Sequence, residues 1–166
     1  MRTKTQKITA TALLAALIFI ATRFIQIPMP AVGYVNAGDG LVILAGWMLS
    51  PGYAFLAAGV GSAIADVLSP YVIYAPATFV IKGIMAVLVA ALFKAFKNKN
   101  TVIPSIVGSI SAEIIMIGGY FLYEGLLFGF KTAMLSVPFN SIQGGVAVVI
   151  GVVLVNVMSK TKLHKQ

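Results

Sequence analysis

Four long apolar runs constrain this chain more than any other feature of its sequence. They cover residues 8–27, 71–93, 102–123 and 133–158, and none contains more than one charged residue. A helix of about 20 apolar residues crosses the hydrocarbon core of a bilayer. Because 60% of the 166 residues are hydrophobic and only 10% are charged, a water-soluble domain of this size has no means of burying them. Each run therefore predicts a transmembrane helix.

The stretch 39–68 permits two interpretations, because Ser50-Pro51-Gly52 interrupts it with a turn signal. It forms either one kinked helix or two short helices. The distribution of positive charge separates the two, since cytoplasmic loops carry an excess of Lys and Arg. Two short helices give six spans and put all three basic clusters on one side of the membrane. The clusters are Arg2, Lys4 and Lys7; Lys94, Lys97 and Lys99; and Lys160, Lys162 and Lys165.

We therefore predict an all-α, polytopic membrane protein with six transmembrane helices, both termini in the cytoplasm and a single domain over residues 1–166. The second helix is short for a bilayer, so the segment 26–36 before it is expected to dip into the bundle and border a cavity open to the outside. The outer loops are expected at 28–36, 69–70 and 124–131. The six helices are expected at about 8–27, 38–49, 52–68, 72–95, 102–124 and 133–158.

Several classes of function are excluded by what the sequence lacks. Cysteine is absent and the single histidine, His164, lies in the C-terminal tail, so we expect no catalytic residues, no metal and no cofactor. No GxxxxGK[ST] segment is present, so the chain does not hydrolyse ATP itself. The net charge of +8 lies mostly beside apolar runs. It therefore indicates contact with the anionic headgroups of a lipid bilayer and not with nucleic acid.

Charged residues inside the predicted spans are functional candidates, because a charge in the membrane is costly. Glu113 lies near the middle of its span, and Tyr120 and Glu124 follow on the same face of the helix. A carboxylate below a phenol suits an amino-substituted or protonated heteroaromatic ring. The alternative role of Glu113 is a structural ion pair with Lys82.

Two roles are possible for Lys82. It binds an anionic or hydroxyl group of a ligand, or it neutralises the charge of Asp39 or Asp66 and holds helices together. Asp39 follows a glycine and precedes an apolar helix, which predicts a helix N-cap.

Uncharged amides offer a donor and an acceptor for ring nitrogens and hydroxyls. The candidate substrate-binding residues are Asn36, Lys82, Glu113, Tyr120, Asn140 and Gln143.

Four segments of the chain resemble the substrate-binding S component of energy-coupling factor (ECF) vitamin transporters. The resemblance is closest to the branch with riboflavin-type and hydroxymethylpyrimidine-type S components, and it spans most of the chain. Length, six spans and cytoplasmic termini also suit that family. The segments are 38–46 (GDGLVILAG), 50–52 (SPG), 59–66 (GVGSAIAD) and 74–83 (YAPATFVIKG).

The resemblance implies a vitamin-capturing subunit, not an enzyme, in the plasma membrane of a prokaryote. Its implied partners are a transmembrane T component and two ATP-binding cassette ATPases, and its implied ligand site is an outward-facing pocket. In this family an AxxxA motif on the first helix packs on the T component, and Ala12 and Ala16 match that motif. Hydroxymethylpyrimidine is the first candidate ligand and pyridoxine the next, because few basic residues are present to bind a phosphorylated ligand.

Three other functions remain open. The first is a stand-alone secondary transporter that couples uptake to protons through Glu113. The second is a membrane enzyme, which would need a cluster of nucleophile, base or metal ligands that the sequence lacks. The third is a structural assembly factor that binds no small molecule.

The even number of spans is directly testable. Reporter tags fused to the two ends of the chain are expected to lie on the same, cytoplasmic side of the membrane, because all three basic clusters then satisfy the positive-inside rule. Fluorescence of a cytoplasm-active reporter and activity of a periplasm-active reporter measure this. Tags on opposite faces would contradict the six-span topology and the outward cavity together.

Overall fold

The computed structural model describes residues 3–30, 32–96 and 101–160, and nearly all of them are helical. All six predicted helices are present, with ends that differ from the predicted ones by a few residues. The basic residues Arg2, Lys97, Lys99, Lys162 and Lys165 lie outside the described residues. The elements are α1 (Lys4–Phe24), β1 (Gln26–Pro28), β2 (Tyr34–Asn36), α2 (Asp39–Met48), α3 (Pro51–Val67), the 3₁₀ turn η1 (Val72–Tyr74), α4 (Ala75–Ala95), α5 (Val102–Phe128) and α6 (Phe130–Lys160).

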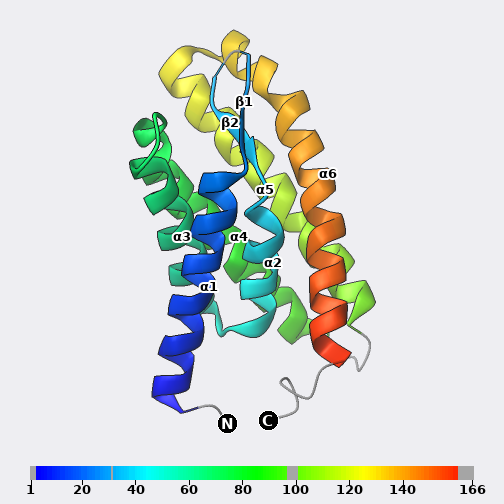
Figure 1. Cartoon of the computed structure of the whole chain (residues 1–166). Helices are drawn as coiled ribbons and strands as arrows, with labels where there is room; N and C mark the ends of the chain where they lie inside the picture. The colour runs from blue at the N-terminus through cyan, green and yellow to red at the C-terminus, as the bar shows by residue number, and fades with distance from the viewer. Residues whose placement is uncertain (1–2, 31, 97–100, 161–166) are drawn as a thin grey trace.

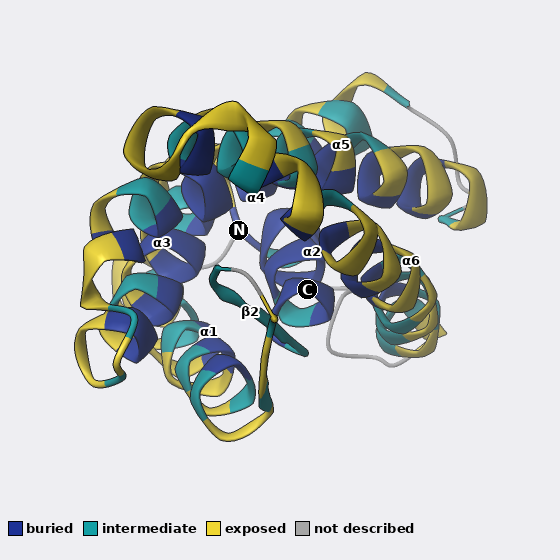
Figure 2. Cartoon of the chain, turned by 90° about the horizontal axis from the view of Figure 1, so that it is seen from above, coloured by how far each residue is buried: buried dark blue, intermediate teal, exposed yellow. Residues whose placement is uncertain are grey.

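Four helical segments are long and apolar enough to cross a membrane: Lys4–Phe24, Val72–Ala95, Val102–Phe128 and Val137–Lys160. The helix α3 has 17 residues and α2 only 10. Large apolar side chains such as Leu13, Ile114 and Ile142 face outward, and exposed residues cover the outside of the helix ring in Figure 2. Lipid is the solvent that accepts such a surface, so the chain is a helical membrane protein.

The helix α2 occupies the centre of the bundle. Eight of its 10 residues are buried, and it packs against α4, α6, α3 and α1, as the view from above in Figure 2 shows. A helix that is apolar all round is stable when it is enclosed on every side. At about 1.5 Å per residue it spans only about 15 Å, so one end of the bundle centre is left for other segments.

An antiparallel hairpin of β1 and β2 fills that end (Figure 1), with Gln26 paired to Asn36 and Pro28 to Tyr34. The segment 26–36 was expected to dip into the bundle as irregular chain, but it forms a hairpin: β2 is half-buried and contacts α6 and α1, whereas Ile27 and Pro28 of β1 are exposed. The two strands pair their backbone groups with each other, and the backbone amide of Asn36 donates to Gln143 of α6. We call this end of the bundle the hairpin end.

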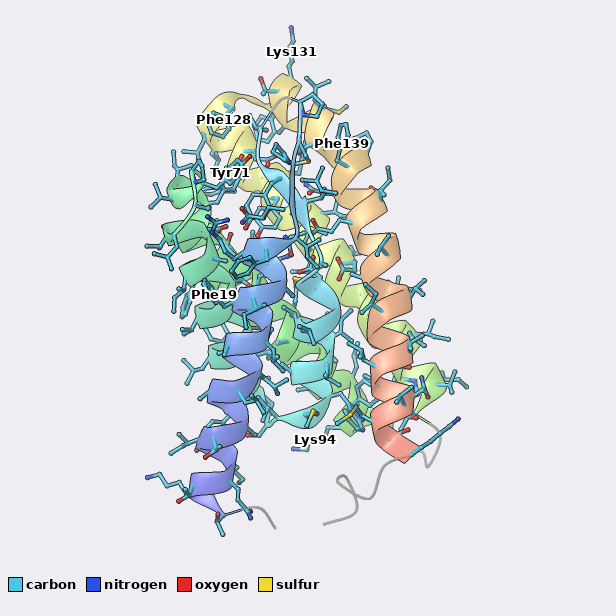
Figure 3. The ribbon with its side chains drawn as sticks, viewed as in Figure 1. Phe19, Tyr71, Lys94, Phe128, Lys131 and Phe139 are labelled. Carbon is cyan, nitrogen blue, oxygen red and sulfur yellow. The ribbon has the colours of Figure 1, made fainter. Side chains whose placement is uncertain are left out.

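The opposite end carries most of the described surface lysines, including Lys4, Lys94 and Lys160, and we call it the lysine end. The start of α1 and the end of α6 both lie there (Figure 1). Figure 3 shows Lys94 at this end and Lys131 at the hairpin end. The even number of membrane crossings stays a prediction.

The first helix uses its two faces differently. On one face, Ala15 meets Gly61 of α3 so closely that a Cβ added to the glycine would lie 2.5 Å from the Ala15 carbonyl oxygen. Small residues allow such close approach of helices in lipid. Ala12 and Ala16 are exposed on the other face, so this pair takes no part in the packing of the chain on itself.

The predicted outer loop at 124–131 is wrong. Helix α5 continues to Phe128 and α6 begins at Phe130, so Gly129 alone joins them. Gly129 has φ +86°, a conformation that glycine adopts at little cost, and this permits the abrupt reversal. As a consequence Glu124 lies inside α5 and is 1% exposed, whereas the sequence had placed it at the junction of the predicted helix 102–124 and the outer loop.

Candidate functional site

A buried ion pair lies at the centre of the bundle. The ammonium of Lys82 on α4 contacts Oδ1 of Asp39 at the start of α2, and each side chain is 1% exposed. The other carboxylate oxygen of Asp39 accepts a hydrogen bond from Nε2 of Gln143 on α6. A single carboxylate therefore joins three helices, and we call Asp39, Lys82 and Gln143 the charged centre.

The predicted capping role of Asp39 is wrong. The N-cap of α2 is Gly38, and no side chain caps the helix. The carboxylate of Asp39 binds Lys82 and Gln143 instead, because charge-assisted hydrogen bonds are about twice as strong as neutral ones. Asn36 makes two hydrogen bonds beside the charged centre. Its side-chain Oδ1 accepts from the backbone amide of Gly38 at 2.8 Å, and its backbone amide donates to Oε1 of Gln143 at 2.7 Å.

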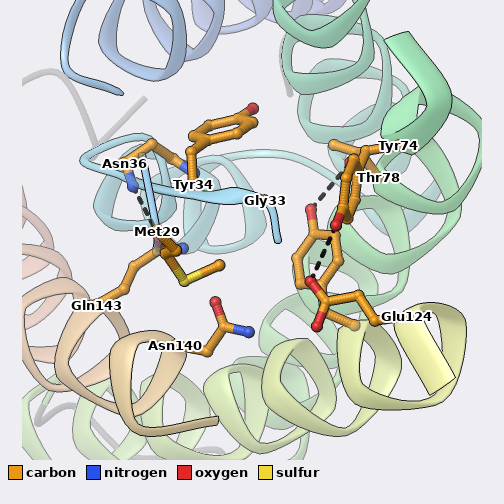
Figure 4. Close-up of a pocket in the computed structure, with 10 residues that line it drawn as sticks. Met29, Gly33, Tyr34, Asn36, Tyr74, Thr78, Glu124, Asn140 and Gln143 are labelled. Atoms are coloured by element: carbon orange, nitrogen blue, oxygen red, sulfur yellow. Dashed lines mark hydrogen bonds between the residues drawn. The ribbon is translucent and has the colours of Figure 1, made fainter. Parts of the chain in front are cut away.

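Above the charged centre, the hairpin closes over a cavity between α4, α5 and α6 (Figure 4). The space between its atoms measures about 290 Å³, open solvent at its mouth included. We call it the hairpin cavity. Its lining residues are Met29, Gly33, Tyr34, Asn36, Tyr74, Thr78, Tyr120, Glu124, Asn140 and Gln143.

Aromatic rings form one wall of the hairpin cavity. The hydroxyls of Tyr120 and Thr78 lie 3.0 Å apart, and the ring centroids of Tyr74 and Tyr120 are 6.3 Å apart. The ammonium of Lys82 lies 5.3 Å from the centroid of the Tyr120 ring, within the range of a cation–π contact. The charged centre thus touches the back of the aromatic wall.

Glu124 contributes a carboxylate to the same wall. Its Oε1 accepts from the Tyr74 hydroxyl at 3.3 Å and its Oε2 from the Ser136 hydroxyl. Among the described residues, no Lys or Arg forms an ion pair with it. The sequence contained an indication that Glu124 belongs to the site, because Glu124 follows Glu113 and Tyr120 on one helix face. The error in the end of α5 kept it out of the predicted site.

Asn140 presents an unused amide to the cavity. Its side chain is 3% exposed, lines the cavity and points into the space between Met29 and Glu124 in Figure 4. No hydrogen bond joins this side chain to another described residue. An amide buried to this degree is normally satisfied, so Asn140 is positioned to bond with a molecule that enters.

Glu113 lies deeper than the cavity and is absent from its lining. It is 4% exposed, and neither carboxyl oxygen forms a hydrogen bond with a described residue. Its side chain packs against Gly144, where an added Cβ would come within 3.2 Å of Oε2. The ion pair with Lys82 that the sequence allowed is not formed, since Lys82 binds Asp39.

The hairpin is fastened to α3 by one side-chain contact. The phenol of Tyr34 on β2 donates a hydrogen bond to Oδ1 of Asp66. Burial, reinforced by the charge of Asp66, raises the pKa of Tyr34, so the phenol stays protonated and remains a donor. The Tyr34 ring also lies 4.6 Å from that of Tyr71, centroid to centroid.

The cavity brings together four of the six predicted site residues: Asn36, Tyr120, Asn140 and Gln143. Lys82 and Glu113 lie outside its lining. The sequence prediction left out six residues that line the cavity: Met29, Gly33, Tyr34, Tyr74, Thr78 and Glu124. A signal for Thr78 existed, because Tyr74, Thr78 and Lys82 follow one another at helical spacing in 74–83.

The fold and the cavity define a helical membrane protein with a small polar cavity at one end. A family model described as "ECF-type riboflavin transporter, S component" matches residues 2–160. A protein of Pyrococcus woesei, described as an uncharacterized protein in gap 3' region, is 32% identical over 133 residues, which cover 80% of this chain and 87% of that protein. The chain belongs to the ECF-type riboflavin transporter S-component family. That family consists of transporter subunits and not of enzymes.

The ion pair of the charged centre yields a stability prediction. Replacing Lys82 with Met keeps an apolar stem but leaves the buried carboxylate of Asp39 without a cation. We expect the free energy of unfolding to fall by about 3–5 kcal/mol, measured as a lower melting temperature of the detergent-purified protein.

The matched control is the double variant Lys82→Met/Asp39→Asn. It removes both charges and keeps an acceptor for Gln143, so it is expected to recover most of the lost stability. A single variant as stable as the wild type, or a double variant no better than the single one, would contradict the role of the ion pair.

Proposed function

We propose that this chain captures a small heteroaromatic vitamin or vitamin precursor from outside the cell and delivers it inward together with a T component and two ATP-binding cassette ATPases. The lysine end faces the cytoplasm, and the hairpin end faces outward. The single observation that carries the proposal is the hairpin cavity, with phenol rings, a free amide and a carboxylate around one enclosed space. Flat apolar walls with a few fixed polar groups are typical of small-molecule sites.

Hydroxymethylpyrimidine remains the first candidate ligand and pyridoxine the second. A single ring needs the least enlargement of the hairpin cavity, whose free interior in this closed form measures only about 20 Å³. The three-ring riboflavin, which the family description names, is the third candidate and requires the hairpin to move outward. Ring amino groups match Glu124 and Asn140, and ring faces match Tyr74 and Tyr120.

A second candidate function is favoured by the unpaired carboxyl group of Glu113. A stand-alone carrier coupled to protons would use such a group in the membrane interior. Uptake that continues after deletion of the ATPase subunits would favour this carrier over the ATP-driven complex.

Ligand binding to the detergent-purified protein tests the main proposal. We expect the wild type to bind hydroxymethylpyrimidine more tightly than pyridoxine and riboflavin. Loss of one hydrogen bond in Asn140→Ala is expected to weaken binding about tenfold. Ser141→Ala, on the exposed side of the same helix, is the matched control. A wild-type protein that binds every candidate vitamin equally weakly would contradict the proposal.

The exposed pair Ala12 and Ala16 is proposed as the contact with the T component. Ala12→Leu and Ala16→Leu add bulk to a face that packs on nothing in this chain. They are expected to abolish copurification with the T component and to leave the melting temperature and ligand affinity of the isolated subunit unchanged.

Ala91→Leu makes the same change at an exposed position of α4 and is the matched control. It is expected to keep the complex intact. Normal assembly and transport in both α1 variants, or equal loss in the α4 variant, would rule out the proposed docking face.

A further inference from the structure

The distribution of acidic residues in this chain is unusual. The sequence contains four acidic residues against 12 basic ones, and all four acidic side chains are buried. Among the described basic residues only Lys82 is buried. The four are Asp39, Asp66, Glu113 and Glu124.

One cation does not balance four carboxylates. Lys82 is committed to Asp39, and Asp66 receives the phenol of Tyr34. Burying an unpaired carboxylate costs several kcal/mol even after the surroundings relax. The described residues supply no counter-ion for Glu113 or Glu124, so the ionised form of either group needs a positive charge from outside the chain.

Glu124 alone of these four carboxylates lines the hairpin cavity. Two hydroxyl groups, from Tyr74 and Ser136, hold its oxygens and fix their direction without neutralising them. A Cβ added at Gly33, in the turn of the hairpin, would lie 3.3 Å from Oε1, so the hairpin turn lies directly against this carboxylate and a ligand reaches it from the side of Asn140.

A second observation points to the same space. Asn140 is buried, with 3% of the residue exposed. Its side-chain amide points into the cavity near Glu124 and has no hydrogen-bond partner among the described residues (Figure 4). The rings of Tyr74 and Tyr120 line the adjacent wall, and aromatic faces attract cations. A carboxylate, a free amide and two aromatic rings together form a site for a flat, positively charged group.

We propose that the ligand of this chain is bound as a cation, a protonated heteroaromatic ring whose counter-ion is Glu124 and whose edge is held by Asn140. The inference rests on the proposed function and narrows it to ligands with a basic ring nitrogen. Anionic ligands are repelled by Glu124, and neutral rings leave its charge unpaired.

Nuclear magnetic resonance of the bound ligand tests the charge directly. Hydroxymethylpyrimidine labelled with ¹⁵N in the ring is added to the purified wild-type protein, at a pH where the free ligand is neutral. The ¹⁵N shift of the bound ring is expected at the position of the protonated form. A bound ring at the neutral position would overturn the proposal, and this measurement needs no variant.

Three variants identify the counter-ion. Glu124→Gln is expected to weaken binding about 10- to 100-fold and to leave any bound ring neutral. Glu124→Asp keeps the charge and is expected to retain the protonated signal. Glu113→Gln removes a buried carboxylate outside the cavity lining and is also expected to retain it. Loss of the protonated signal in Glu113→Gln, or its persistence in Glu124→Gln, would overturn the assignment to Glu124.

The two proposals fail in different ways. If no candidate vitamin binds the wild type, the proposed function fails and the cationic ligand fails with it. If the wild type binds riboflavin, which is neutral, and rejects hydroxymethylpyrimidine and pyridoxine, vitamin capture stands and the cationic ligand is overturned.

Discussion

The ion pair between Lys82 and Asp39 is the interaction on which the rest of this structure depends. An ammonium and a carboxylate that are both 1% exposed persist in a lipid-solvated bundle only when each satisfies the other. Through Gln143 the pair also ties α2 and α4 to α6. The same amide holds the backbone of Asn36, so the position of the hairpin over the cavity follows from the position of these charges.

The hairpin cavity exists because α2 is short. Because α2 begins well inside the bundle, at Asp39, the hairpin and not a helix completes the centre. Side chains from five elements then meet around one space: β2, η1, α4, α5 and α6. A bundle made only of full-length helices would fill this volume with packed apolar side chains. The cavity is therefore the product of one helix that is too short to cross the membrane.

The sequence predicted the amides and Tyr120 at the cavity because rare polar groups in apolar runs stand out clearly. It misjudged Glu124 because a glycine between two apolar helices gives no measure of how short the turn is, and only the φ of Gly129 made it one residue. It favoured a cap for Asp39 because capping is a local rule, whereas the partner of Asp39 is Lys82, 43 residues away, a pairing that the sequence had offered as one alternative. Long-range charge pairing overrides local preference when both groups are buried.

By itself the sequence determined the solvent and the number and approximate limits of the helices. Those properties follow from apolar length and charge bias, which are read along the chain. Only the tertiary structure decided which carboxylate meets Lys82, that Glu124 and Asn140 share one cavity and that Glu113 lies below it. The reason is physical: helices fix which residues share a face, but the partner across a helix interface depends on rotation and depth, which packing in three dimensions alone sets.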